Sequence, residues 1–201
     1  MLVVAVALFT RRAAFLYRLV RSGKPAARFD DVPARVRAEA TVVVGQSKLL
    51  QRLLPGLMHA AIFWGFLVLF PTILIAFVGA TDPHAAVPWL GGQGWYALLV
   101  DVFALLVLAG VITAFAIRKV QRPARFKGSH VREADVILLL IAGIVCTLFA
   151  WHASQIALHL NDYPASWAPI SNALSHALGG PAIPYLERAA VWAHVLIILT
   201  F

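Results

Sequence analysis

The chain has 201 residues, of which 61% are hydrophobic and only 13% charged, and its formal net charge is +8. A soluble domain of this size carries roughly 45–50% apolar and about 25% charged residues. The composition excludes an ordinary soluble enzyme, a disordered tail and a disulfide scaffold. The long apolar runs predict an all-α, polytopic membrane protein. Cys146 is the single cysteine, so these residues cannot ligate an iron–sulfur cluster through thiolates.

The N-terminal segment 1–10 is apolar, but a helix needs about 20 residues to cross the hydrocarbon core. Arg11 and Arg12 follow it at once. We predict a first helix here, either the inner end of a longer helix or a short helix whose arginines reach the interface. Residues 21–52 form a polar loop with a helix near 33–43.

Four longer apolar segments follow, at 53–80, 95–117, 134–160 and 185–201. With the N-terminal helix they predict one membrane domain over 1–201, a bundle of about five transmembrane helices. The last segment is still apolar at Phe201, so we expect the first and last helices to be incomplete. The loop 161–184 is rich in proline and glycine, with a short interfacial helix predicted at 170–178.

The basic residues indicate the orientation of this bundle. All but Arg188 fall within 11–52 and 118–132, whereas the loops 81–94 and 161–184 contain no lysine or arginine. The positive-inside rule places the two basic regions in the cytoplasm. We therefore predict a multi-pass protein of the cell inner membrane. The cytoplasmic position of the basic residues accounts for the net positive charge, so nucleic-acid binding is not needed to explain it.

Three of the seven histidines lie inside predicted spans: His59, His152 and His194. An ionisable residue within a bilayer is costly and marks a candidate functional site. Imidazoles from facing helices can clamp a haem iron without adding charge. A lone buried histidine is as often a hydrogen-bonding bundle residue. Three on three different helices favour metal ligation, so we predict one or two b-type haems.

Helical rise suggests how these histidines pair. His152 and His194 each lie nine residues from the outer edge, or about 14 Å, and can share one iron. His59 lies only ~9 Å from the inner edge. It would serve a second haem, with a partner expected beyond Phe201. A single haem between His59 and His194 remains an alternative, as does His159 in place of His152, because the two share a helical face.

Other residues allow two interpretations each. Gly56 and Gly65 can admit a flat macrocycle or serve helix packing. Asp101 can carry protons to a quinone or bond a neighbour. Lys48, Arg52 and Arg188 can meet haem propionates or only mark the interface.

The sequence also resembles a known family. Gly45-Gln46-Ser47-Lys48, Leu54-Pro55-Gly56, His59 and Phe63-Trp64-Gly65-Phe66 are similar to the membrane cytochrome b domain related to the gamma subunit of respiratory nitrate reductase. Further matching motifs are Arg125-Phe126-Lys127-Gly128-Ser129-His130 and Trp192-Ala193-His194. The nearest resemblance is to the version fused to, or partnered with, a heterodisulfide-reductase-like iron–sulfur protein.

The resemblance implies a haem b bundle that exchanges electrons between a cytoplasmic iron–sulfur module and a membrane quinone. His59 and His194 carry over by position. One branch of the family accepts electrons from electron-transfer flavoprotein and passes them to menaquinone. The iron–sulfur clusters would belong to a domain or partner outside these residues. A haem-free scaffold that docks an iron–sulfur subunit and a small proton-coupled transporter are the alternative functions.

Overall fold

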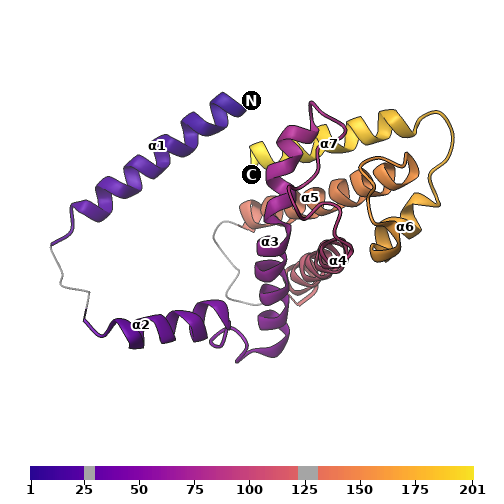
Figure 1. The fold of residues 1–201 in the computed structure, drawn as a ribbon. Coiled ribbons are helices and arrows are strands. Elements are labelled where there is room, and N and C mark those ends of the chain that lie inside the picture. The colour runs from indigo at the N-terminus through magenta and orange to yellow at the C-terminus, as the bar shows by residue number, and fades with distance from the viewer. Residues whose placement is uncertain (25–29, 122–130) are drawn as a thin grey trace.

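The computed structural model describes residues 1–24, 30–121 and 131–201. Its regular elements are helices, as predicted (Figure 1). They are α1 (Leu2–Arg21), α2 (Val32–Glu39), α3 (Leu53–Gly79), α4 (Gly94–Ala116), α5 (Val131–Ala157), α6 (Pro169–Ser175) and α7 (Ile183–Thr200). Single π-helical turns extend α2 and α4, and a 3₁₀ turn precedes α6. The helices predicted at 33–43 and 170–178 are present as α2, with its π turn, and α6.

Four described helices are long and apolar enough to cross a membrane: α3, α4 with its π turn, α5 and α7. They correspond to the four long apolar segments of the sequence and indicate a multi-pass membrane protein. The N-terminal helix differs from its prediction. It does not stop before Arg11 but continues for 20 residues to Arg21. Because it carries four arginines, α1 is not among these four candidate spans.

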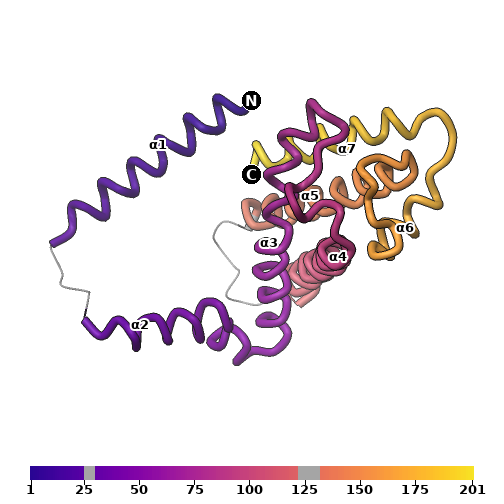
Figure 2. Tube along the Cα trace, viewed as in Figure 1, coloured from indigo at the N-terminus to yellow at the C-terminus, as the bar shows by residue number. Residues whose placement is uncertain are grey.

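The bundle is assembled from pairs of helices. The trace shows α5 and α7 side by side, α3 crossing beside them and α4 nearly end-on (Figure 2). α3 packs on α4, α5 packs on α7, and α4 contacts α5. Small residues set the approach of α3 to α4. A Cβ on Gly65 would lie 2.1 Å from Cγ2 of Val107, so Gly65 serves helix packing rather than a macrocycle.

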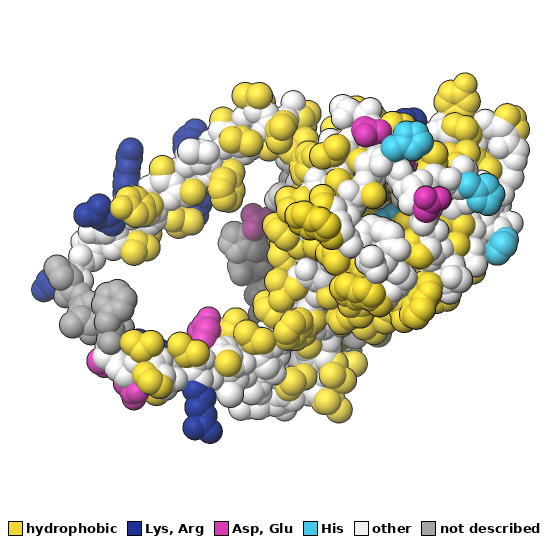
Figure 3. Space-filling view, in the orientation of Figure 1, with side chains coloured by type: hydrophobic (Ala, Val, Ile, Leu, Met, Phe, Trp, Pro, Cys, Tyr) yellow, Lys and Arg dark blue, Asp and Glu magenta, His cyan; other side chains and the backbone are white. Residues whose placement is uncertain are grey.

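α1 and α2 lie outside this bundle, and neither contains a buried residue. Lysine and arginine side chains gather along them, and histidine side chains gather at the opposite side of the body (Figure 3). The described structure thus keeps the basic segments apart from the histidine-bearing loops, as the charge pattern of the sequence requires.

A buried ion pair joins three helices at one end of the bundle. Glu187 on α7 is 2% exposed, forms a two-pronged ion pair with Arg188 and accepts a 3.0 Å hydrogen bond from Nε1 of Trp151 on α5. Arg188 also donates to the Gly79 carbonyl of α3, at 2.9 Å. These partners make a structural role the better interpretation of Arg188.

The orientation can be tested by thiol labelling in a Cys146→Ser background. We expect a membrane-impermeant reagent applied from outside to label His84→Cys and His176→Cys, because both positions are exposed in lysine-free loops. Gln51→Cys, on the basic side, should react only after the membrane is opened. The reverse labelling pattern would contradict the proposed orientation.

Candidate functional site

His194 lies at the centre of the α5–α7 contact and is fully buried. Its Nδ1 is 2.9 Å from the Ile144 carbonyl oxygen and 2.9 Å from the Thr147 hydroxyl. Because a carbonyl oxygen only accepts, Nδ1 must carry the proton. The other ring nitrogen, Nε2, then offers a bare lone pair. Among the described residues it is the one buried side-chain polar atom without a hydrogen-bond partner.

His59 has the same tautomer through a different partner, although it is exposed on α3. Its Nδ1 is 2.9 Å from Oε1 of Gln46, whose Nε2 donates to the Val43 carbonyl at 2.6 Å. The Val43 carbonyl fixes the amide orientation of Gln46, so its oxygen faces the histidine. Nδ1 of His59 is therefore the donor, and Nε2 keeps its lone pair. Histidines that bind metals commonly donate their other N–H in this way.

An apolar groove runs along α3 from His59 to Ile73, with a volume of about 410 Å³. Aliphatic and aromatic side chains of α3, α4, α5 and α7, together with Phe201, form all of its described wall except His59. Ile144, which holds His194, and Ile198, one turn from His194 on α7, are part of that wall. Cofactor sites are usually apolar hollows of about 300–1,000 Å³ with few polar groups. The His59 groove lies within this range of volumes, is apolar and contains one possible metal ligand, His59.

His152 lies at a third position, and its ring is 7% exposed. Its Nδ1 is 3.0 Å from the Tyr163 hydroxyl, and the ring centroids of Trp151 lie 5.7 Å from His152 and 6.3 Å from His194. Burial raises the pKa of Tyr163 above its ordinary value, so its hydroxyl keeps its proton at neutral pH. The cavity beside His152 measures only about 40 Å³. A haem does not fit there without movement of the surrounding helices.

The prediction that His152 and His194 lie at the same depth in the membrane holds only approximately. His194 bonds to Ile144 and Thr147 on α5, and His152 lies five residues beyond Thr147, about 8 Å along the helix. Both rings nevertheless contact the same indole, that of Trp151. The structure therefore brings these two histidines into one neighbourhood.

His59 lies at the other end of α3 from Trp151 and His152. A Cβ on Gly79 would touch Trp151 and lie 3.5 Å from Val191, so the end of α3 contacts α7 just before His194. His59 precedes Gly79 by 20 residues, about 30 Å of helix. Two imidazoles on one metal lie about 2 Å from it. This geometry separates His59 from His152, which adjoins Trp151. Ile144 and Ile198 flank His194 and line the His59 groove, so a single haem between His59 and His194 stays an alternative to two haems.

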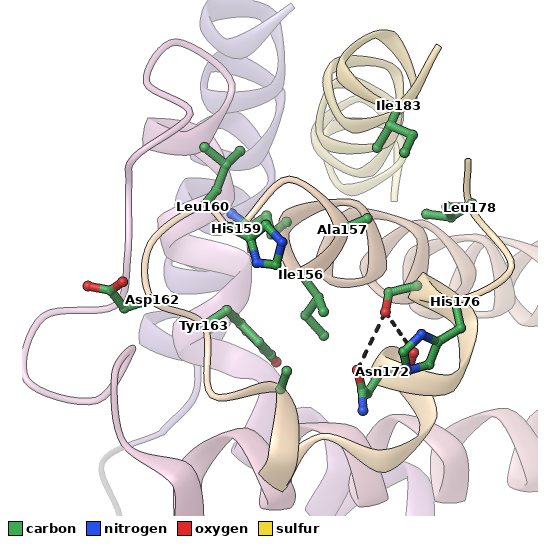
Figure 4. Close-up of a pocket in the computed structure, with 13 residues that line it drawn as sticks. Ile156, Ala157, His159, Leu160, Asp162, Tyr163, Asn172, His176, Leu178 and Ile183 are labelled. Atoms are coloured by element: carbon green, nitrogen blue, oxygen red, sulfur yellow. Dashed lines mark hydrogen bonds between the residues drawn. The ribbon is translucent and has the colours of Figure 1, made fainter. Parts of the chain in front are cut away.

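The structure does not place His159 on α5 with His152, although the sequence predicted a shared helical face. α5 ends at Ala157, and His159 lies beyond it with φ +52°. It therefore does not share a helical face with His152. It lines an outer cavity of about 500 Å³, with Tyr163 nearby and Asn172 and His176 on the far wall (Figure 4).

Asp101 is 1% exposed, and α6 accounts for its hydrogen bonds. Its carboxylate accepts from the backbone N–H groups of Ile170 and Ser171 at 2.6 and 3.1 Å, and from the Ser171 hydroxyl at 2.6 Å. It therefore caps the start of α6 from the neighbouring helix α4. Of the two interpretations of Asp101, bonding a neighbour is the one observed.

We expect Asp101→Ala to lower the free energy of unfolding by about 1–3 kcal/mol, because it strands buried N–H donors. Thermal unfolding in detergent measures the loss, and proteolysis within 161–184 should accelerate. Asp101→Asn keeps an acceptor and should lose less. Unchanged stability together with lost electron transfer would instead favour a role in proton transfer.

Three side-chain partners of the histidines are not predicted by the sequence: Gln46, Thr147 and Tyr163. Gln46 enters the sequence analysis only as part of a family motif. A polar residue on one helix cannot be recognised from sequence as the partner of a histidine on another, because the sequence does not show which helices face each other. Lys48 and Arg52 are exposed, and the motif 125–130 lies outside the described residues.

The chain is similar to two curated oxidoreductases. It is 32% identical over 124 residues to the EtfAB:quinone oxidoreductase of Syntrophomonas wolfei, covering 61% of this chain and 17% of that protein. It is 23% identical over 171 residues to the probable iron–sulfur-binding oxidoreductase FadF of Bacillus subtilis, covering 83% and 24%. No family model and no solved structure matches it.

The chain thus spans about a fifth of the length of these relatives. It is a membrane segment distantly homologous to parts of quinone-linked and iron–sulfur oxidoreductases. That relationship agrees with the quinone and iron–sulfur context expected from the sequence.

Proposed function

We propose that this chain is a haem b-binding membrane anchor that passes electrons between a cytoplasmic iron–sulfur module and membrane quinone, with menaquinone as the expected species. The observation that carries the proposal is His194, whose buried Nε2 lone pair has no partner among the described residues. A buried acceptor left unpaired costs about 1–3 kcal/mol. A metal ligated at that atom removes the cost.

The proposal assigns ligands to two centres. His59 is the ligand of an inner haem in the apolar groove, where it is the one histidine among the described lining residues. His194 is the ligand of an outer haem, with His152 as its partner. The contact that both rings make with Trp151 supports the pairing of His194 with His152. Because the cavity beside His152 measures only about 40 Å³, the segments around it must move apart when haem enters.

The haem would supply one-electron oxidation and reduction within the membrane. The protein residues hold and orient the ligands. The Ile144 carbonyl fixes the tautomer of His194, and Gln46 fixes that of His59.

The names of the relatives support both proposed partners in electron transfer, the iron–sulfur module and the quinone. One is named for its reaction with EtfAB and quinone, and the other for binding iron–sulfur. We therefore propose an iron–sulfur domain or protein, and through it electron-transfer flavoprotein, as partners in the cell inner membrane.

Quinol-driven reduction tests this function. A reduced menaquinone analogue added to the purified, haem-loaded protein should generate the absorption bands of ferrous haem b. Addition of the oxidised quinone to dithionite-reduced protein should reverse them. Haem that dithionite reduces but quinol does not would contradict electron exchange with quinone.

A further inference from the structure

Gln46 is a buried side chain within an exposed loop. It is 4% exposed, whereas Gly45, Ser47 and Lys48 around it are all exposed. Its backbone takes a left-handed φ of +52° and its carbonyl accepts two 3.0 Å hydrogen bonds, from the N–H groups of Leu49 and Leu50. Burial of a polar side chain beside charged, solvated neighbours needs a specific partner. For Gln46 that partner is His59.

A glycine of α3 leaves room for the loop to pack against that helix. A Cβ on Gly56 would lie 2.4 Å from the Leu49 carbonyl oxygen and 2.8 Å from Cα of Leu50. The loop backbone therefore occupies the space that any other residue would fill at Gly56. His59 lies about one helical turn further along α3. The glycine thus allows the loop to bring Gln46 to the histidine, and no macrocycle is needed to explain it.

The side chain of Gln46 is fixed at both ends of its amide. Nε2 donates to Val43, and Oε1 accepts from Nδ1 of His59. The first bond sets the orientation of the amide, and the second sets the tautomer and the orientation of the imidazole ring. An acceptor on Nδ1–H raises the basicity of the opposite nitrogen, which is the atom available to a metal.

From this arrangement we propose that Gln46 is a positioning residue for the haem ligand His59, and that it tunes the potential of the inner haem. The inference rests on the proposed function, because it takes His59 to be a ligand. A stronger acceptor at position 46 makes the imidazole a better donor to iron and lowers the reduction potential. Loss of the acceptor raises the potential and frees the ring to rotate.

The test compares Gln46→Met, which keeps the length and removes the acceptor, with Gln46→Glu, which strengthens it. Gln51→Met is the matched control, because Gln51 is an exposed glutamine of the same loop. Haem b is titrated into the full-length apoprotein, and each loaded variant is followed by potentiometric titration and low-spin electron paramagnetic resonance. These readouts do not depend on enzymatic activity.

We expect Gln46→Met to weaken haem binding at the inner centre by about 10–100-fold, the usual effect of losing such a partner. The inner-haem potential should rise in Gln46→Met and fall in Gln46→Glu, whereas Gln51→Met should leave it unchanged. Shifts of opposite sign distinguish tuning of the ligand from a general loss of packing. If Gln46→Met is poorly folded, the downward shift in Gln46→Glu alone carries the test.

His59→Ala separates the two levels of the argument. If it loses the inner haem while both Gln46 variants behave like Gln51→Met, the role of Gln46 is overturned and haem binding by His59 stands. If His59→Ala keeps all of its haem, the ligand assignment fails, and the role of Gln46 fails with it.

Discussion

His194→Ala is expected to lose the outer haem and to reduce the haem-to-protein ratio to about half of the wild-type value. The substitution removes the ligand whose Nε2 is buried and unpartnered in the described bundle. It also leaves a cavity between α5 and α7, which should cost about 2–5 kcal/mol of stability by analogy with other large-to-small core changes. Pyridine haemochrome analysis of the purified variant gives the ratio directly.

A double variant tests the pairing of His194 with His152. If both histidines ligate one iron, His152→Ala removes the same haem, and the double variant retains as much haem as either single variant. Such non-additivity is the signature of residues that act on one centre. His84→Ala and His176→Ala change exposed loop residues and should leave haem content unchanged. Full haem retention in His194→Ala would defeat the ligand assignment.

The second large effect is expected for His59→Ala. This variant should lose the inner haem and keep the outer one, again retaining about half of the haem absorbance. The reason is the roughly 30 Å of helix between His59 and Gly79, because Gly79 touches Trp151, which adjoins His152 of the proposed outer pair. Combined with His194→Ala, the variant should retain no haem.

The outcome also distinguishes one haem from two. With a single shared haem, His59→Ala would lose nearly all of the absorbance by itself, and the added His194→Ala would change nothing more. That result would contradict the separation of the centres along α3.

The four long helices could be predicted because their apolar runs match the thickness of a bilayer. The helix ends could not. α5 stops at Ala157 because His159, Asn161 and Asp162 all adopt positive φ. The pattern of apolar residues in the sequence does not reveal such a turn. The composition of residues 1–10 suggested a short helix, but backbone hydrogen bonding continues through Arg11 and Arg12 to Arg21.

The histidines could be recognised because an ionisable residue in an apolar span is conspicuous. Their partners could not, because the contacts join distant parts of the chain. Asp101 meets α6 some 70 residues later, and His194 meets Thr147 across 47 residues. Even the shorter link from Gln46 to His59 depends on a loop folded against Gly56. These contacts depend on packing geometry, which the order of residues does not display.

The reduced-minus-oxidised absorption spectrum of the purified full-length protein tests the central claim most directly. Two low-spin haems with bis-histidine ligation should give the sharp bands of a b-type cytochrome, with a pyridine haemochrome ratio near two haems per chain. A protein that is folded and free of haem, and that takes up none when haem b is added, would contradict the account and favour a haem-free membrane scaffold.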